Sequence, residues 1–489
     1  MRTLFPQCMP RSMPRLELNS QAARRRTSTR RGVLLRLTGV LALLVGLSSV
    51  GAKTAGAAND WKAGAAKTLI TPEKFMWMAG YGGRNHPAEA KTSDLYAKAL
   101  VIEDAAGRRA AVITLDVVGI DRTLSASVCQ RLEQKYKLSR GQIAICTSHT
   151  HCGPVVGKCL GPMHYYLVDE AQQKLIDEYA RTLEEKIVAT VGEAIGKLAP
   201  SSLSWGSGTT TFAVNRRTNA EAQVPELKAQ GKLKGPSDHD VPVLAVKDAD
   251  GKLQAVLFGY ACHATVLSFY EWCADYPGFA QTELEKSHPG AVALFWAGCG
   301  ADQNPLPRRT VELAQSYGSM LAKAVDEVLA KPMTTVASKL ETGYREIPLP
   351  LGKLPTDAEL AETAKSNDKF QASRAKVLLK QIEQTKQPLA TTYPYPVSVW
   401  KIGDEVQFIA LGGEVVVDYS LRLKMELRGV KTWVAGYSHD VMAYIPSRRV
   451  LTEGGYEGGG SMVYYGLPTI WAPEVEEALV KEVHRAAGK

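Results

Sequence analysis

The chain has 489 residues, of which 45% are hydrophobic and 22% are charged, an ordinary composition for a globular protein with no low-complexity tract. The formal net charge is +9, but ten of the 59 lysines and arginines lie in residues 1–57. Residues 58–489 hold 49 basic and 49 acidic side chains, so charge gives no reason to expect nucleic acid as a partner.

Residues 1–57 are predicted to form an export signal. A basic segment ends in Arg30-Arg31, an apolar run follows over 33–50, and small residues at 55–57 form a cleavage site. The paired arginines favour the twin-arginine route, and a long general secretory signal is the alternative. We therefore expect a periplasmic or secreted protein whose mature chain, 58–489, has no transmembrane segment.

The mature chain alternates predicted strands with predicted helices. Apolar runs bounded by turn residues predict strands at 66–72, 95–102, 109–118, 142–146, 241–246, 253–261, 292–296, 340–348, 397–402, 406–411 and 432–435. Helical periodicity marks 125–136, 170–198, 278–286, 311–329, 357–387 and 473–487. Residues 355–390 are charged and flanked by prolines, which indicates an inserted helical hairpin. The alternation predicts one large α/β domain of mixed β-sheets flanked by helices.

Chemically active side chains follow several of these strands. His149 and His151 come just after the strand at 142–146, and on extended backbone residues two apart point to the same side. His263 ends another apolar strand, and Glu414 follows a predicted hairpin. Strand ends are the usual place for a ligand or a metal in α/β proteins. We therefore expect these side chains to meet in a metal site at the strand ends.

The residue types suit metal-assisted hydrolysis. Two neutral imidazoles and a carboxylate are the ligand set of a catalytic zinc ion, which keeps one position open for water. Such an ion lowers the pKa of its water to about 7, and a further histidine can pass a proton to a leaving amine. Spacing alone leaves open two alternatives: histidines that cap strand ends by bonding to backbone, and a binding protein whose histidines are all hydrogen-bonded.

Other candidate residues have plainer interpretations. Asp116 interrupts an apolar run, so it either holds a histidine or makes a structural hydrogen bond. His439, next to Asp440, is expected near the pocket or on a surface loop. His239 lies between two aspartates and is typical of a turn. Cys299 follows a buried strand and is interpreted as a packed cysteine rather than a nucleophile.

The mature chain resembles the catalytic region of the neutral, non-lysosomal ceramidase family. The matching motifs keep the family's order and approximate spacing. They are His149-Thr150-His151-Cys152-Gly153-Pro154, Val214-Asn215-Arg216, residues 258–265, Gly413-Glu414, and Gly436-Tyr437 through Tyr444-Ile445 to Tyr456-Glu457-Gly458.

The resemblance implies a role for each matching residue. The catalytic zinc would have four protein ligands, namely His149, His263, Glu414 and Tyr444. His151 would give a proton to the leaving group, and Arg216 and Tyr456 would polarise or orient the amide carbonyl. The choice of zinc also comes from the resemblance, because a tyrosine ligand suits iron as well.

The chain departs from the family pattern in two places. Gln303 occupies the position of the family's active-site serine, and a glutamine can hydrogen-bond the carbonyl but cannot be a nucleophile. This favours attack by zinc-activated water. In addition, only about thirty residues follow Tyr456, where the family's ceramidases continue into a β-sandwich domain. We therefore expect a substrate that is ceramide-like or a smaller, soluble amide.

These observations predict an exported, zinc-dependent amidohydrolase that cleaves an N-acyl amide. One alternative is an esterase or a deacylase that uses the same metal site. The other is a catalytically inactive member of the family that only binds a metal or a ligand. The sequence leaves the oligomeric state open.

Overall fold

The computed structural model describes residues 60–488, and the predicted export signal lies outside this range. Within it, the chain forms a nine-stranded mixed sheet. The strand order is β11 (Val292–Ala297), β9 (Leu253–Tyr260), β8 (Asp240–Asp248), β6 (Ala199–Thr209), β1 (Trp61–Leu69), β3 (Tyr96–Glu103), β4 (Arg109–Leu115) and β5 (Ile143–Thr147), with β13 (Thr334–Thr335) also pairing with β6. The β11–β9 and β4–β5 pairs are parallel, and the others are antiparallel.

A second mixed sheet comes from the C-terminal half of the chain. Its order is β14 (Leu340–Pro350), β15 (Thr392–Ile402), β16 (Val406–Leu411) and β18 (Lys431–Ala435), and only the last pair is parallel. Three short pairs lie outside the two sheets. They are β10 (Glu271–Trp272) with β2 (Ala90–Lys91), β12 (Gln303–Pro305) with β7 (Ala213–Asn215), and β17 (Glu414–Val415) with β19 (Tyr444–Ile445). The predicted α/β class with mixed sheets is confirmed.

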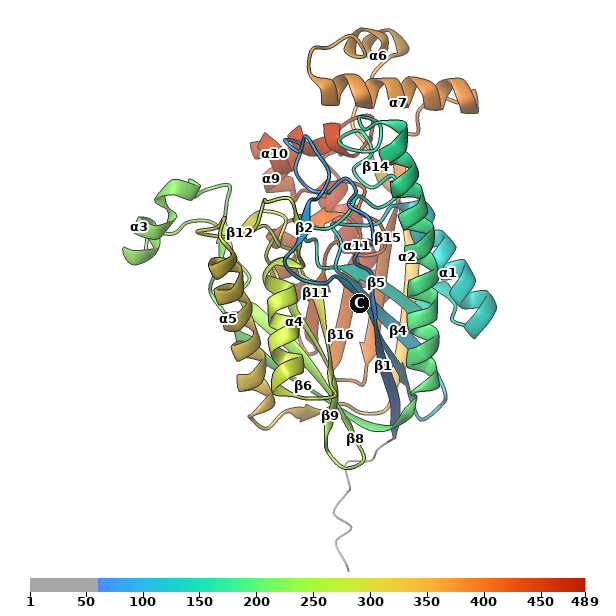
Figure 1. Ribbon diagram of the computed structural model, residues 1–489. Coiled ribbons are helices and arrows are strands. Elements are labelled where there is room, and N and C mark those ends of the chain that lie inside the picture. The colour runs from blue at the N-terminus through green and yellow to red at the C-terminus, as the bar shows by residue number, and fades with distance from the viewer. Residues whose placement is uncertain (1–59, 489) are drawn as a thin grey trace, which may run out of the picture. The chain divides into compact units, whose positions relative to one another are not determined.

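The two sheets lie face to face between helices. The large sheet is covered by α1 (Arg122–Tyr136), α2 (Glu170–Gly196), α4 (Asp275–Ser287) and α5 (Val311–Leu329), and the small sheet by α8 (Val417–Glu426) and α11 (Val475–Ala487) (Figure 1). Side-chain alternation along β3 shows the reason, because Ala99 and Val101 pack toward the helices while Leu100 and Ile102 pack toward the second sheet. Among residues 60–488, no helix is long and apolar enough to cross a membrane.

Strand β6 is a central strand that the sequence pattern did not predict. It is rich in serine, glycine and threonine, so it lacks the apolar run used to recognise strands. The small residues are needed because α5 packs closely on it. At Gly208, a Cβ would lie 2.8 Å from the backbone oxygen of Ala324 in α5. Tertiary packing therefore selects glycine where β-propensity alone disfavours it.

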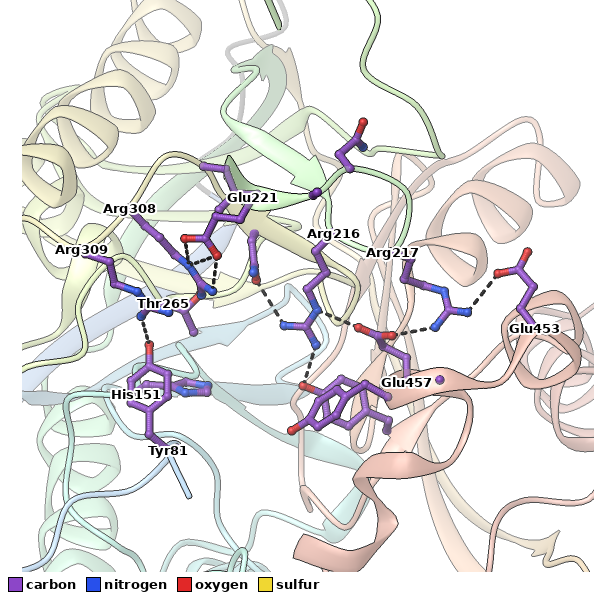
Figure 2. Close-up of a pocket in the computed structure, with 18 of the residues that line it drawn as sticks. Tyr81, His151, Arg216, Arg217, Glu221, Thr265, Arg308, Arg309, Glu453 and Glu457 are labelled. Carbon is purple, nitrogen blue, oxygen red and sulfur yellow. Dashed lines mark hydrogen bonds and ion pairs between the residues drawn. The ribbon is translucent and has the colours of Figure 1, made fainter. Parts of the chain in front are cut away.

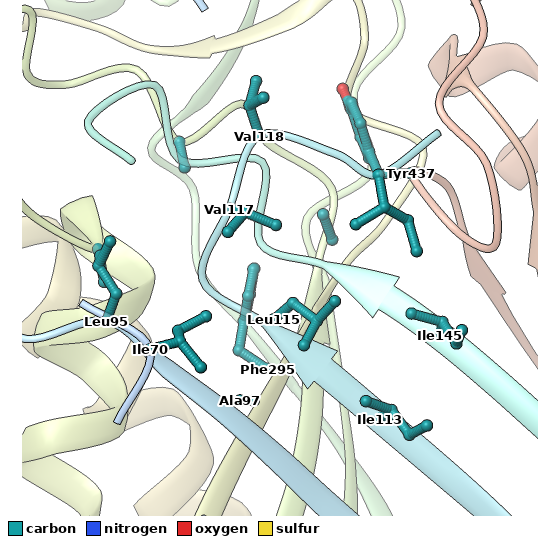
Figure 3. Packing of buried hydrophobic residues seen from close by; sticks show 14 of the residues in the cluster. Ile70, Leu95, Ala97, Ile113, Leu115, Val117, Val118, Ile145, Phe295 and Tyr437 are labelled. Atoms are coloured by element: carbon teal, nitrogen blue, oxygen red, sulfur yellow. The ribbon is translucent and has the colours of Figure 1, made fainter. Parts of the chain in front are cut away.

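The segment that follows β18 joins the two outer strands of the large sheet. The Gly436 amide donates to Ala297 O of β11 at 3.0 Å, and the His439 amide donates to Ile145 O of β5 at 2.7 Å. Between these contacts, the Tyr437 side chain packs on the core beside residues such as Ile145 (Figure 3). The ends of β5, β11 and β18 are thereby held at one place in the fold.

The remaining helices are peripheral. α6 (Asp357–Thr363) and α7 (Lys369–Thr385) connect β14 to β15 within the range 355–390 and share a small apolar cluster (Figure 1). In α7, Phe370 packs edge-on against Tyr464, with 5.1 Å between the ring centroids. The short helices are α3 (Val224–Ala229), α9 (Arg448–Glu453) and α10 (Gly455–Gly458).

Asp440 is expected to make stability depend on pH. Burial raises the pKa of this carboxyl to about 7, against the opposing effects of Tyr393 and Arg122. The folded protein therefore holds this proton more tightly than the unfolded chain does. The stabilisation, up to about 4 kcal/mol, is present below about pH 4 and is lost as pH rises through 7.

Urea unfolding of the wild type and of Asp440→Asn at pH 5 and pH 8 tests this expectation. The asparagine keeps an acceptor for the Tyr393 hydroxyl but does not titrate. The wild type should lose stability relative to the variant between the two pH values. Parallel pH profiles would show that Asp440 carries no such proton.

Candidate metal centre and its pocket

Four segments bring the predicted metal ligands together. His149 follows β5, with a left-handed φ of 59° that turns the chain, and His263 follows β9. Glu414 and Tyr444 come from β17 and β19, which pair in parallel so that these two residues are register partners. The predicted ligands, which are separated by up to 295 positions in the sequence, are therefore neighbours in the fold.

The ligand atoms lie within about one hydrogen-bond length of one another. Glu414 Oε2 is 3.2 Å from His149 Nε2 and 3.0 Å from His263 Nε2. The Tyr444 hydroxyl is 3.3 Å from His263 Nε2, and His151 Nε2 is 3.1 Å from His149 Nε2. All five side chains are buried. The centre is thus compact and largely buried.

Backbone carbonyls determine which nitrogen of each histidine carries the proton. His149 Nδ1 lies 2.5 Å from Val118 O, and His263 Nδ1 lies 2.7 Å from Gly300 O. A carbonyl only accepts, so each Nδ1 must be the donor and each neutral Nε2 keeps its lone pair. Both lone pairs then face Glu414 Oε2, which is buried without a hydrogen-bond donor. Lone pairs gathered in this way could be neutralised by a metal cation.

The spacing also fits a metal ion. Ligand atoms at 2.0–2.1 Å from a tetrahedral zinc lie about 3.3 Å apart. The contacts of Glu414 Oε2 with the two imidazoles, at 3.0 and 3.2 Å, and of Tyr444 with His263, at 3.3 Å, are close to this value. Within the described residues, His149, His151 and His263 also form a buried group whose ligand atoms all lie within 4.8 Å of one another. The buried histidines can therefore hold a metal ion.

Electrostatics in the centre favour the forms that bind metal. Burial lowers the pKa of His263 to about 4, helped by Arg216, so the imidazole is neutral at pH 7. Burial, with Glu414, raises the pKa of Tyr444 well above 10, and a bound cation would act in the opposite direction.

Tyr465 supports the centre from outside, and sequence reasoning missed it. Its hydroxyl donates to Glu414 Oε1, the carboxylate oxygen that faces away from the histidines. The Tyr437 ring lies against His149, with 4.3 Å between the ring centroids. Both tyrosines contact predicted ligands without being predicted ligands themselves. Contacts of this kind orient ligands and affect the metal affinity of a site. No spacing rule links Tyr465 to Glu414, so only the fold could reveal it.

Tyr465→Phe is expected to weaken metal binding by about 10–100-fold, because it removes the one hydroxyl that orients the Glu414 carboxylate. Competition with a chromophoric chelator at pH 7 would measure the affinity. The neighbouring Tyr464→Phe is the matched control, since the Tyr464 ring packs on Phe370. Equal affinities for the two variants would show that the Tyr465 contact does not matter.

A cavity of about 700 Å³ opens beside the centre, and Figure 2 shows its wall. It is lined by His151 and Tyr444, together with Arg216 and Tyr456, so these four predicted site residues share one space. The remaining predicted ligands, His149, His263 and Glu414, are not part of the lining. His151 therefore lies on the pocket side of the metal centre.

Arg216 is held rigidly in the pocket wall. Its guanidinium donates to the Tyr444 hydroxyl at 3.1 Å, to Glu457 at 2.7 Å and to the Asn304 side chain at 3.2 Å. Burial opposes its charge, but Tyr444 and Glu457 outweigh burial and keep the pKa of Arg216 well above its usual value. The Tyr456 ring contacts the Tyr444 ring at 5.2 Å between centroids. A fixed cation and a phenol thus border the space beside the metal ligands.

Gln303 is not brought into the pocket. Its amide donates to Ala261 O at 2.5 Å and accepts from the Asp238 backbone at 3.2 Å. The backbone carbonyl of Gln303 accepts a hydrogen bond from the His263 backbone amide at 2.9 Å. Gln303 therefore supports the loop that carries His263, and its predicted contact with the substrate carbonyl stays a prediction.

The other residues singled out from the sequence lie elsewhere. His439 is buried, hydrogen-bonded to Arg140 and Ser398, and neither lines the cavity nor lies on the surface. Asp116 accepts the Tyr96 amide at 3.0 Å, a structural hydrogen bond. Cys299 is packed in the core between the small sheet and its helices, where burial raises the pKa of the thiol and disfavours a nucleophile.

Residues 61–298 match the family model described as neutral/alkaline non-lysosomal ceramidase, N-terminal. This part of the chain belongs to that family. It contains His149, His151, Arg216 and His263, while Glu414 and Tyr444 lie beyond the match.

Individual ceramidases are distant relatives. Neutral ceramidase 3 of Arabidopsis thaliana is 25% identical over 296 residues, which are 60% of this chain and 36% of that protein. Neutral ceramidase of Drosophila melanogaster is 23% identical over 255 residues, or 50% of this chain and 35% of that protein. The chain thus spans about a third of the length of the curated relatives it matches.

Solved ceramidase structures share the fold. A ceramidase complexed with C2 superposes with a TM-score of 0.68 at 20% identity. The neutral ceramidase from Pseudomonas aeruginosa superposes with a TM-score of 0.66 at 19% identity. Each alignment covers 88% of this chain and 75% of the other, so the likeness extends well beyond the family match.

Proposed function

We propose that the protein is a zinc-dependent amidohydrolase that cleaves an N-acyl amide. The observation that carries the proposal is the convergence of imidazole lone pairs and a buried carboxylate oxygen beside a pocket that also holds His151 and Arg216. His149, His263, Glu414 and Tyr444 would hold the ion. When bound, the ion would activate water at neutral pH and polarise a carbonyl.

Two residues of the chain would serve the substrate directly. Arg216, kept charged by Glu457, would donate to the amide oxygen and stabilise the negative charge that develops there. His151 is neutral, because burial and then His149 lower its pKa well below 6.5. It would take the proton of the attacking water and deliver it to the departing amine nitrogen.

The pocket wall favours an amide smaller than ceramide. Among the residues that line the cavity, only Ala220 and Leu306 are aliphatic. Long alkyl chains bind through buried apolar contacts, whereas most side chains of this wall are charged or polar and its other apolar surface comes from three tyrosine rings. The same groups would also act on an ester carbonyl, so an esterase is the second candidate.

We also propose that the protein is exported to the periplasm or secreted. Support comes from the basic, apolar and small-residue segments of 1–57, in that order. Cell fractionation, with N-terminal sequencing of the exported chain, would test it. Full-length protein retained in the cytoplasm would contradict export.

The test of function is turnover by the mature chain loaded with zinc. N-acyl amides with acyl chains from two to sixteen carbons are compared with esters of the same acids, and free amine or alcohol is measured. Metal-dependent release of amine from short-chain amides supports the proposal. Faster cleavage of the esters would favour the esterase, and tight zinc binding with no turnover would favour a binding protein.

A further inference from the structure

We propose that the pocket selects N-acyl compounds whose amine half carries a carboxylate, as in an N-acyl amino acid, and that Arg309 binds this carboxylate. The inference rests on the proposed function, because it names the substrate class of the same site. Four observations carry it: an unmatched positive charge, a distance, an unpaired buried hydroxyl and a constrained backbone.

The pocket wall holds one arginine more than it has carboxylates to match. Arg216 and Arg217 both pair with Glu457 at 2.7 Å, and Arg217 also reaches Glu453. The Arg308 side chain pairs with Glu221 at 2.7 Å (Figure 2). Within residues 60–488, Arg309 has no carboxylate partner, although it lines the same cavity. A positive charge is therefore free to bind an anion.

Arg309 lies within reach of the reacting bond. Its guanidinium is 5.6 Å from the Tyr81 ring centroid, and the Tyr81 ring is 4.8 Å from the His151 ring (Figure 2). The guanidinium carbon is thus no more than about 10.5 Å from the imidazole centroid. A span of about 10 Å is expected when an imidazole hydrogen-bonds an amine nitrogen and, one carbon further on, a carboxylate hydrogen-bonds a guanidinium. This is the chain of groups that an N-acyl α-amino acid would supply.

The amine half is the part of the substrate that faces Arg309. His151 delivers its proton to the departing nitrogen in the proposed reaction, and Tyr81 connects His151 to Arg309. Arg216, which contacts the Tyr444 hydroxyl, instead serves the carbonyl oxygen. The two arginines therefore have different targets in one substrate.

Thr265 supplies a second polar contact. It is 2% exposed, lines the cavity, and its hydroxyl has no hydrogen-bond partner among the described residues. A buried hydroxyl without a partner typically costs about 1–3 kcal/mol, which a bound polar group would offset. A carboxylate has enough lone pairs to accept from both Thr265 and Arg309.

The backbone holds Arg309 in place before any ligand binds. Its φ is 101°, a left-handed value that costs a non-glycine residue energy and is often found at ligand sites. Its amide donates to Val266 O at 2.7 Å, which ties Arg309 to the neighbour of Thr265. The two groups that would bind the carboxylate are thus fixed relative to each other.

The test uses N-hexanoylglycine and N-hexanoylglycinamide, which differ only in the terminal group of the amine half, a carboxylate in one and a neutral amide in the other. Binding to the zinc-loaded protein and kcat/KM are measured for the wild type, Arg309→Gln and Lys331→Gln. Lys331 is the charge-matched control, because it is exposed just beyond the other end of α5, a helix about 28 Å long. The wild type should bind the carboxylate compound about 10–100-fold more tightly than the amide.

Arg309→Gln should remove this preference and leave glycinamide binding within about twofold of wild type, while Lys331→Gln should change neither. Equal affinity of the wild type for both compounds, or a preference that survives in Arg309→Gln, would overturn the inference. Selective binding without hydrolysis would uphold it and sink the proposed function. Hydrolysis of both compounds without selectivity would support the proposed function and overturn the inference about Arg309.

Discussion

His263→Ala is expected to lose the bound metal ion and to lower amide hydrolysis by about 10³-fold or more. The change removes one of the two imidazole lone pairs that face Glu414 Oε2. A bound catalytic metal ion would supply several kcal/mol of transition-state stabilisation, which corresponds to a rate change of at least about three powers of ten. Metal content by elemental analysis and kcat/KM on the preferred amide measure the two effects.

His288→Ala is the matched control for this experiment. His288 is a partly exposed histidine that pairs with Asp326 at 2.7 Å and lies outside the buried histidine group. It should keep about one ion per chain and wild-type activity. A full complement of metal in His263→Ala would contradict the assignment of His263 as a ligand, and the hydrolase proposal would then lose its foundation.

His151→Gln is expected to keep the metal and lose about 10²–10⁴-fold in kcat, the usual contribution of a positioned acid–base group. His151 lines the cavity, whereas His149, His263 and Glu414 do not. Its Nδ1 is buried without a hydrogen-bond partner in the described part of the chain, so no backbone carbonyl there fixes its tautomer as Val118 O does for His149. The His151 imidazole can therefore take up and release a proton. The proton on Nδ1 of His149 is instead held by the backbone carbonyl.

Metal content and kcat must be measured on the same preparation of His151→Gln. The control is His239→Gln, because His239 hydrogen-bonds Ala213 O at 2.9 Å just before β8 and lies outside the cavity lining. Loss of the ion in His151→Gln would make His151 a ligand rather than a proton carrier. Loss of neither metal nor activity would remove it from the mechanism.

Much of the fold could be predicted from local patterns. The apolar face of α5 repeats with helical period, and its predicted bounds of 311–329 are those of the structure. The strands β16 and β9 are largely apolar runs ended by turn residues. By contrast, β6 could not be predicted, because its serines and glycines are selected by the close approach of α5 rather than by strand propensity.

The candidate site divides in the same way. His149, His151 and His263 could be found because each follows an apolar strand, and strand ends are where α/β folds bind ligands. Glu457 and Tyr465, which hold Arg216 and Glu414, carry no local signal of those contacts. Their partners lie up to 241 positions away in the chain, and a contact of that range is set by packing.

The sequence by itself determined the class of the fold, the ends of the strands on which the reactive side chains lie, and the resemblance to ceramidases. Only the tertiary structure decided that these ends meet. The segment after β18 hydrogen-bonds to both β11 and β5, the outer strands of one sheet, and so gathers ligands that local periodicity cannot connect. The structure alone also showed that Arg309 has no carboxylate partner among residues 60–488, because the pairing of charges depends on distance in space and not along the chain.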